Sequence, residues 1–274
     1  MSSGEIRAVL FDAGQTLLHV RTSVGTEYAR TAARHGIRVD ADDIERRFRL
    51  AWVSSIDRAR ARGHRCSDAI LSAEWREIVR ETFPPEIPTV KLGPIFEELY
   101  SRFSSMDAWS LAPGVRASLE TLRGLGIRLG VLSNWDSRLP VLLAQIGIRD
   151  CFHFTVISFE TGFEKPHPEM FRRGMSLAGT LPRETLIVGD SLEADILPAI
   201  QLGMRTLWVA PREDLERRPD LGPGIDRLPE DPASFWGDLL SGRFWDGRAQ
   251  RPVPCPRLEE DPFAGGLRKP WKPV

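Results

Sequence analysis

Cysteine is scarce in this chain, and its placement excludes two kinds of protein. The 274 residues include three cysteines, Cys66, Cys151 and Cys255. Their odd number and wide separation do not match a disulfide framework, and they lack the close pairs typical of a structural zinc site. We therefore expect a reduced, cytoplasmic setting.

Long hydrophobic runs and a net charge are also missing. No stretch approaches the ~18 apolar residues of a membrane helix, and no signal-type segment precedes the apolar run from Ile6 to Phe11. The formal net charge is -1, from 37 basic and 38 acidic residues. A general attraction to nucleic acid or to an anionic membrane is therefore not expected. We predict neither kind of partner.

Lysine is the rarest charged residue type. Arginine supplies nearly all positive charge, because the chain has only Lys91, Lys165, Lys269 and Lys272. A lysine ammonium is a compact charge that can rotate, whereas an arginine guanidinium is a planar fork. A site that needs a compact ammonium therefore has few candidates here.

Apolar runs followed by polar residues predict an α/β fold. Buried parallel strands are expected at Ala8 to Phe11, Leu129 to Leu132, Val156 to Phe159, Leu186 to Val188 and Arg205 to Ala210. Helical spacing is found between them at Val115 to Leu125, Leu139 to Ile146, Glu169 to Leu177 and Ala194 to Leu202, with helix-ending glycines at Gly126, Gly147, Gly179 and Gly203. The alternation predicts a Rossmann-like parallel sheet with helices on both faces.

The stretch from Leu17 to Asp107 is different, because it has long helical patterns and little strand-like sequence. Helices are expected at Gly25 to His35, Ala41 to Ala61 and Ser67 to Phe83. With 274 residues and 42% hydrophobic composition, two domains are expected. We predict an α/β core of residues 1–16 and 110–240, an α-helical cap domain of residues 17–109, and a proline-rich, mobile tail of residues 241–274.

Polar residues follow four of the predicted strands. They are Asp12, Ser133 with Asn134, Lys165, and Asp190 with Asp195. Taken alone, an Asp or Ser after a strand is more typical of a turn or a helix N-cap. Lys165 alone would be a solvated loop residue, and Asp195 alone a surface charge or an anchor for a neighbouring loop. Since ligands of parallel α/β sheets gather at the carboxyl ends of the strands, the four together predict one site.

This ordered set resembles the haloacid dehalogenase-like (HAD) superfamily over about residues 5–240. The phrases Leu-Ser-Asn-Trp-Asp, Glu-Lys-Pro-His-Pro-Glu-Met-Phe and Val-Gly-Asp-Ser-Leu-Glu-Ala-Asp are similar to subfamily I, whose helical cap occupies the position of the insert, and most similar to its REG-2-like branch. The resemblance implies a hydrolase of small phosphorylated or otherwise anionic substrates.

The resemblance also implies a role for each residue of the site. Asp12 would be the nucleophile, assisted by Ser133 and Lys165 as catalytic groups. Mg²⁺ would be bound by Asp12, Asp190 and the main-chain carbonyl of Gly14, since hard oxygen ligands suit this ion. The remaining roles are a supporting one for Asp195 and substrate binding for Thr16 and Asn134.

Gly14 departs from the pattern of phosphatases in this superfamily, which place a second Asp two residues after the nucleophile. General acid-base help of that kind is typically worth ~10²- to 10⁴-fold, and Gln15 cannot supply it. His19 is one candidate substitute. The alternatives to a Mg²⁺-dependent phosphatase are a metal-independent 2-haloacid dehalogenase, whose halide needs no acid to depart, and a catalytically weak HAD-fold binding protein. Asp190 weakens the dehalogenase reading, because those enzymes lack that acid.

The predicted cap contains a basic stretch from Arg46 to Arg65, with seven arginines and the single acid Asp57. A lid that attracts anions is one reading. A solvated helix face balanced by acids elsewhere in the insert is the preferred one, and Trp52 and Trp75 are likewise expected in the cap core rather than against substrate.

Overall fold

A six-stranded parallel sheet forms the centre of the part of the chain that is described. The computed structural model describes residues 6–209 and 226–227. Within them, the strand order is β5-β4-β1-β6-β7-β8. The bounds are Ala8–Phe11 (β1), Arg128–Ser133 (β4), Phe154–Ile157 (β5), Thr185–Gly189 (β6), Arg205–Trp208 (β7) and Asp226–Arg227 (β8). This confirms the predicted α/β fold with a Rossmann-like parallel sheet.

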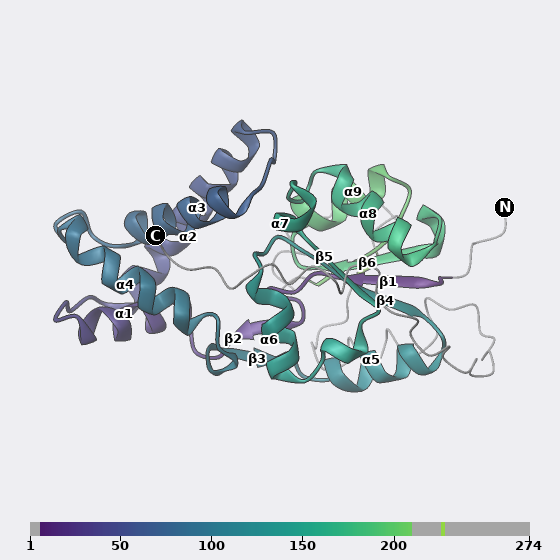
Figure 1. Ribbon diagram of the computed structural model, residues 1–274, viewed down its shortest axis with the longest axis horizontal. Helices are drawn as coiled ribbons and strands as arrows, with labels where there is room; N and C mark the ends of the chain where they lie inside the picture. The colour runs from purple at the N-terminus through teal and green to yellow at the C-terminus, as the bar shows by residue number, and fades with distance from the viewer. Residues whose placement is uncertain (1–5, 210–225, 228–274) are drawn as a thin grey trace.

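Helices cover both faces of this sheet (Figure 1). One face carries α5 (Val115–Gly124) and α6 (Arg138–Ile146), and the other carries α7 (Ser158–Thr161), α8 (Pro168–Ala178) and α9 (Leu197–Gln201). Side chains alternate along β1, so that Val9 and Phe11 pack with the α5 and α6 residues, whereas Leu10 packs with those of α8 and α9.

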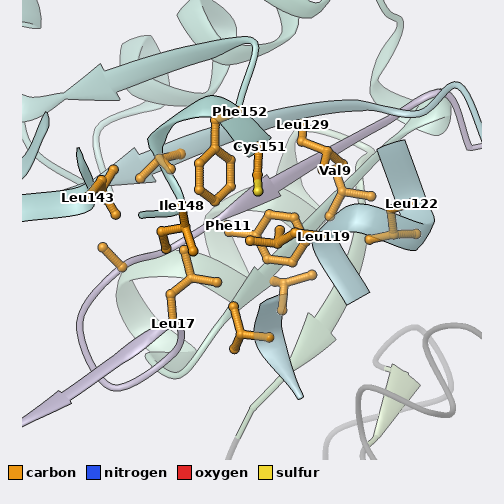
Figure 2. Packing of buried hydrophobic residues seen from close by; sticks show 14 of the residues in the cluster. Val9, Phe11, Leu17, Leu119, Leu122, Leu129, Leu143, Ile148, Cys151 and Phe152 are labelled. Carbon is orange, nitrogen blue, oxygen red and sulfur yellow. The ribbon is translucent and has the colours of Figure 1, made fainter. Parts of the chain in front are cut away.

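The larger hydrophobic cluster lies under α5 and α6 (Figure 2). Phe11 is fully buried there and meets Phe152 edge to face, with ring centroids 6.2 Å apart. Each large side chain removed from water in this way contributes ~1.5–3 kcal/mol. The packing fixes the end of β1, and therefore the place of Asp12, which follows it.

The predicted helix ends are confirmed. Gly147 and Gly179 are the C-cap residues of α6 and α8, with φ of 77° and 63°. Gly126 and Gly203 each follow a C-cap residue and both have φ of 77°.

Two predicted elements were placed wrongly. The strand expected at Val156 to Phe159 ends at Ile157, because α7 begins there and turns Phe159 toward the large cluster. The helix expected at Ala194 to Leu202 begins instead as a π-helix at Leu192–Ile196 and continues as α9. Pro198 has no N–H to bond back along the helix, which breaks the regular pattern at this point. Ala210, the predicted end of β7, lies outside the described residues.

The insert contains four helices with a hydrophobic cluster of their own. Their bounds are Val24–Arg34 (α1), Ala41–Ala61 (α2), Asp68–Thr82 (α3) and Thr89–Arg102 (α4). The first three match the predicted helices and begin at side-chain caps on Ser23, Asp40 and Ser67, each worth about 1 kcal/mol. Among the described helices, none combines the length and apolar character needed to cross a bilayer.

An antiparallel ribbon connects this insert to the sheet, and the sequence did not predict it. Its strands are β2 (Leu18–Val20) and β3 (Trp109–Leu111). Leu17 and Leu18 pack in the sheet cluster, not with the helices of the insert. Strands of three residues are too short to show a period. The domain division at residues 16 and 110 stays a prediction, and the tail of residues 241–274 lies outside the described residues.

Candidate active site

The sheet order brings the predicted residues together. Strand β1 lies between β4 and β6, so the residue after β1 is flanked by the residues at the ends of its two neighbours. The Asp12 amide donates a hydrogen bond of 2.9 Å to the carbonyl of Val188 and extends the pairing of β1 with β6. Ser133 ends β4 and Asp190 follows β6. Their side chains therefore converge at one edge of the sheet.

A buried ammonium joins two of the carboxylates. Lys165 is 4% exposed, and its Nζ lies 2.6 Å from Oδ1 of Asp12 and 2.6 Å from Oδ1 of Asp195. Burial alone would lower the pKa of Lys165, but the two carboxylates outweigh it and raise this pKa. Ser133 donates a hydrogen bond of 3.0 Å to the same Oδ1 of Asp12. Lys165 therefore stays charged, and Lys165 and Ser133 both contact Asp12, the predicted nucleophile.

Three carboxylates crowd around this single ammonium. Oxygen atoms of Asp12, Asp190 and Asp195 lie within 4.8 Å of one another. Burial and then the charges of Asp12 and Asp195 raise the pKa of Asp190 to about 8. Burial also raises the pKa of Asp195 to about 6, since it outweighs the opposing charge of Lys165. Thr16 is buried and donates to Oδ1 of Asp190 at 3.4 Å. The close approach of three carboxyl groups and their all-oxygen donors fit a hard divalent cation such as Mg²⁺, whose charge would favour the ionised form of all three.

The acidic loop after β6 is held by residues on both sides. A Cβ added to Gly189 would lie 2.4 Å from Cγ of Asp195, so this carboxylate fills the space beside the glycine. Its Oδ2 also accepts a hydrogen bond of 3.1 Å from the amide of Ser191. Trp208 donates from Nε1 to the carbonyl of Asp190 at 2.8 Å. The sequence reasoning missed Trp208, although its place at the end of a predicted strand was a usable signal.

Asn134 contacts the backbone of Lys165, and its role in substrate binding stays a prediction. Its Oδ1 accepts a hydrogen bond of 2.6 Å from the amide of Lys165, and its Nδ2 donates to the carbonyl of Lys165 at 2.9 Å. Both polar atoms of the side chain are therefore bound to the Lys165 backbone. Asn134 supports the lysine directly, and binding of substrate by this side chain would have to replace these bonds.

Gly14 faces an aromatic ring. A Cβ added there would lie 3.5 Å from Cζ3 of Trp135, an ordinary van der Waals distance, and Gly14 does not have the positive φ that disfavours other residues. Gln15 has it instead, with φ of 55°. Its Oε1 lies 3.2 Å from Nδ1 of His19, and burial lowers the pKa of that imidazole. His19 as a substitute acid stays a prediction.

The insert touches both loops that carry the catalytic candidates. At the end of α2, Arg62 forms an ion pair of 2.9 Å with Glu164, the residue before Lys165. On α4, the ring of Tyr100 lies 3.7 Å from the Arg138 guanidinium carbon. Arg138 also binds Asp136, in the loop that follows Ser133, at 2.7 Å.

The basic stretch of the insert is balanced by acids, as preferred from the sequence. Six of its seven arginines form ion pairs with carboxylates, namely Arg46, Arg47, Arg49, Arg58, Arg60 and Arg62. Trp75 packs against the cluster of the insert as predicted. Trp52 touches Trp75 but is 44% exposed, so its assignment to the cap core was only partly right.

The chain is similar to known proteins over most of its length. A sequence profile described as a haloacid dehalogenase-like hydrolase matches residues 6–203. The haloacid dehalogenase-like hydrolase domain-containing protein 3 of Bos taurus is 33% identical over 215 residues, which are 77% of this chain and 85% of that protein. The rhythmically expressed gene 2 protein of Drosophila melanogaster is 29% identical over 238 residues, which are 82% and 91% of the two chains.

Solved structures share the fold. A HAD-hydrolase of Bacillus subtilis bound to magnesium aligns with a TM-score of 0.64, 20% identity, and coverage of 86% of this chain and 99% of that chain. An L-2-haloacid dehalogenase aligns with a TM-score of 0.61 and 19% identity, over 86% of this chain and 100% of that chain. A HAD phosphatase of Thermococcus onnurineus aligns with a TM-score of 0.55 and 22% identity, over 86% of this chain and 99% of that chain.

Proposed function

Because the chain belongs to the haloacid dehalogenase-like hydrolase family, we propose that it hydrolyses a small phosphate ester with Asp12 as nucleophile and with Mg²⁺ as cofactor. The observation that carries this proposal is the arrangement of Lys165 between Asp12 and Asp195, with Asp190 as a third carboxylate. When ionised, three carboxylates against one ammonium leave a negative charge that a divalent cation can balance, and the bound cation can then attract an anionic group. Asp12 and Asp195 already pair with Lys165, so the third carboxyl group, Asp190, is explained better by a bound cation.

Two half-reactions follow from these contacts. A carboxylate oxygen of Asp12 attacks phosphorus in line, and the bond from phosphorus to the leaving oxygen breaks, so that the leaving group departs with its electron pair. Water then attacks the phosphorus of the aspartyl phosphate and releases inorganic phosphate and the free carboxylate. Each step transfers a group with three charged or partly charged oxygens.

The residues around Asp12 have separate tasks in these steps. Lys165 neutralises charge that develops on the transferring group and holds Asp12 through their ion pair. Ser133 can turn its hydroxyl from Asp12 to an oxygen of that group. Asp12, Asp190 and the carbonyl of Gly14 would hold Mg²⁺, which when bound supplies positive charge against the phosphoryl oxygens. Asp195 holds Lys165 in place.

A 2-haloacid dehalogenase is the second candidate, favoured by Gly14, which leaves no acid two residues after Asp12. Halide departs as a stable anion and needs no proton. In that reaction the Asp12 carboxylate would displace halide from carbon, and Asp190 would have no metal to bind. A catalytically weak HAD-fold protein that binds a phosphorylated ligand or a protein partner is the third.

A panel assay separates the three candidates. Purified protein is incubated with a set of phosphate esters and with 2-haloacids, each with and without Mg²⁺, and released phosphate and halide are measured. We expect phosphate release that requires Mg²⁺. Halide release without Mg²⁺ would favour the dehalogenase, and ligand binding without turnover of either class would favour the binding protein.

A further inference from the structure

An aromatic side chain lies beside Gly14, two residues after the proposed nucleophile. A general acid two residues after Asp12 would extend from the Cβ position of residue 14, toward the oxygen that departs. In this chain that position is empty, and the Trp135 ring lies 3.5 Å from it. The group that phosphorus loses as Asp12 attacks would therefore depart beside an indole, at the place where the acid would otherwise be.

Trp135 is held firmly in this place. Its amide donates to Oγ of Ser158 at 3.1 Å, and the same hydroxyl donates to its carbonyl at 3.0 Å. Its ring packs against the ring of Trp109, with centroids 5.2 Å apart. Trp135 follows β4 and Trp109 begins β3, so two separate elements build one aromatic wall. Both side chains are partly buried against the large cluster, which restricts their rotation.

The missing acid and the aromatic wall select the same chemistry. Without a proton donor at Gly14, an ester whose leaving oxygen carries a stabilised negative charge will react fastest. An aryl oxide meets this need, because its charge spreads into the ring. A planar ring also gains about two- to tenfold in affinity from an aromatic neighbour, beyond the effect of the area that it buries. An alkyl alcohol has neither advantage.

We propose, on the basis of the function proposed above, that the substrate is a phosphate monoester of an aromatic hydroxyl compound, and that its ring packs against Trp135. The phosphoryl group passes to Asp12, and the aryl oxide leaves with the electron pair of the broken P–O bond and takes a proton from water. Hydrolysis of the aspartyl phosphate then consumes one water. The net products are a phenol and inorganic phosphate.

The test compares aryl and fluoroalkyl phosphates whose leaving groups have matched acidity, so that only the ring differs. We expect kcat/KM to favour the aryl ester by about tenfold. Trp135→Leu should remove this preference, while Trp135→Phe should keep most of it. Trp52→Leu, in α2, is the matched control and should leave the turnover of both esters unchanged. Thermal unfolding and circular dichroism check that each variant is folded.

A binding measurement keeps this inference separate from the proposed function. Phenylphosphonate and methylphosphonate contain no P–O ester to break, and their affinities are measured by calorimetry in the presence of Mg²⁺. We expect the phenyl compound to bind about tenfold more tightly, and Trp135→Leu to abolish the difference. Equal affinities together with equal turnover of the two matched esters would overturn the aromatic selection and leave the phosphatase function standing. Absence of binding and of turnover for every compound would overturn both.

Discussion

The side-chain amide of Asn134 forms two hydrogen bonds with the backbone of Lys165. It accepts from the lysine amide at 2.6 Å and donates to the lysine carbonyl at 2.9 Å. Two loops that follow β4 and β5 are thereby joined beneath the ammonium. The hydroxyl of Ser133, at the end of β4, and the ammonium of Lys165 reach the same oxygen of Asp12.

Asn134→Leu should lower turnover more than it lowers stability. The loss of two hydrogen bonds costs about 1–3 kcal/mol of unfolding free energy, whereas a misplaced Lys165 can cost ~10²-fold in rate. Steady-state kinetics and urea unfolding measure the two effects. Ser137→Ala, in the same loop, is the control and should leave both unchanged. A variant with normal turnover would show that Asn134 does not position the lysine.

Asp12→Asn should abolish hydrolysis and leave the fold nearly unchanged. The amide has the shape of the carboxylate but is a poor nucleophile, and Lys165 keeps its ion pair with Asp195. Phosphate release and thermal unfolding are the measurements, with Asp57→Asn on the exposed face of α2 as control. Retention of most of the turnover would contradict the assignment of the nucleophile.

Mg²⁺ should bind saturably and stabilise the protein, because only the folded chain assembles the three acids. Binding at a hundred times the dissociation constant adds ~2.7 kcal/mol to the unfolding free energy. Asp190→Asn should remove most of this gain, whereas Asp42→Asn in the first turn of α2 should not. Calorimetric titration and melting curves test it. Equal Mg²⁺ binding by both variants would argue for the dehalogenase.

Gly14→Asp should raise the hydrolysis of alkyl phosphates with poor leaving groups, by at most the ~10²- to 10⁴-fold typical of an acid-base group. The structure gives room for the change, since the added Cβ meets only Trp135 at 3.5 Å and Gly14 needs no positive φ. Esters with good leaving groups should gain less in the first step. Single-turnover rates for the two substrate types provide the comparison. A folded variant with no gain on either type would mean that the missing acid does not limit the site.

Glu27→Gln should destabilise the insert in a pH-dependent way. Glu27 is 3% exposed and binds Arg102 at 2.9 Å and Thr22 at 2.9 Å. Burial alone would raise the pKa of Glu27, but hydrogen bonds from Arg102 and Thr22 and the charge of Arg102 lower it overall. A carboxyl with a lowered pKa stabilises the fold above the unfolded-state pKa and loses this effect as pH falls through its folded-state pKa.

The expected cost of Glu27→Gln is therefore ~1.5–3 kcal/mol at pH 7 and shrinks as the pH falls below about 4.5. Urea unfolding over this pH range measures it. Glu86→Gln, at an exposed position between α3 and α4, should show no such dependence. A cost for Glu27→Gln that stays constant with pH would exclude the charged hydrogen bonds as its cause.

The sequence was sufficient to predict the sheet and the meeting of its polar ends. Asp12 and Asp190 each follow a buried run, and parallel strands bring such residues to one edge whatever the loops do. The helices of the insert were equally readable, because α2 and α3 are long and begin at capping residues. These features depend on local periodicity and on the general rules of parallel sheets.

Contacts between loops could not be predicted in this way. The bonds from Asn134 to Lys165, and the approach of Trp135 to Gly14, depend on the paths of two connections across the edge of the sheet. Asn134 was assigned to substrate because its sequence position gave no sign of the lysine backbone beside it. The three-residue strands β2 and β3 were missed for a different reason, since they are stabilised by pairing with each other and by packing on the sheet cluster.

The absence of a side chain at Gly189 leaves the space that Asp195 occupies. Asp195 lies where a side chain of residue 189 would be, with Cγ 2.4 Å from that point, and Asp195 in turn anchors Lys165. An ordinary carbon contact needs ~3.5–4.0 Å, so Gly189→Ala would push the acid outward by roughly 1 Å and carry the lysine with it. Gly189 takes part in no chemical step, but its lack of a side chain affects the distance between Asp12 and the ammonium of Lys165.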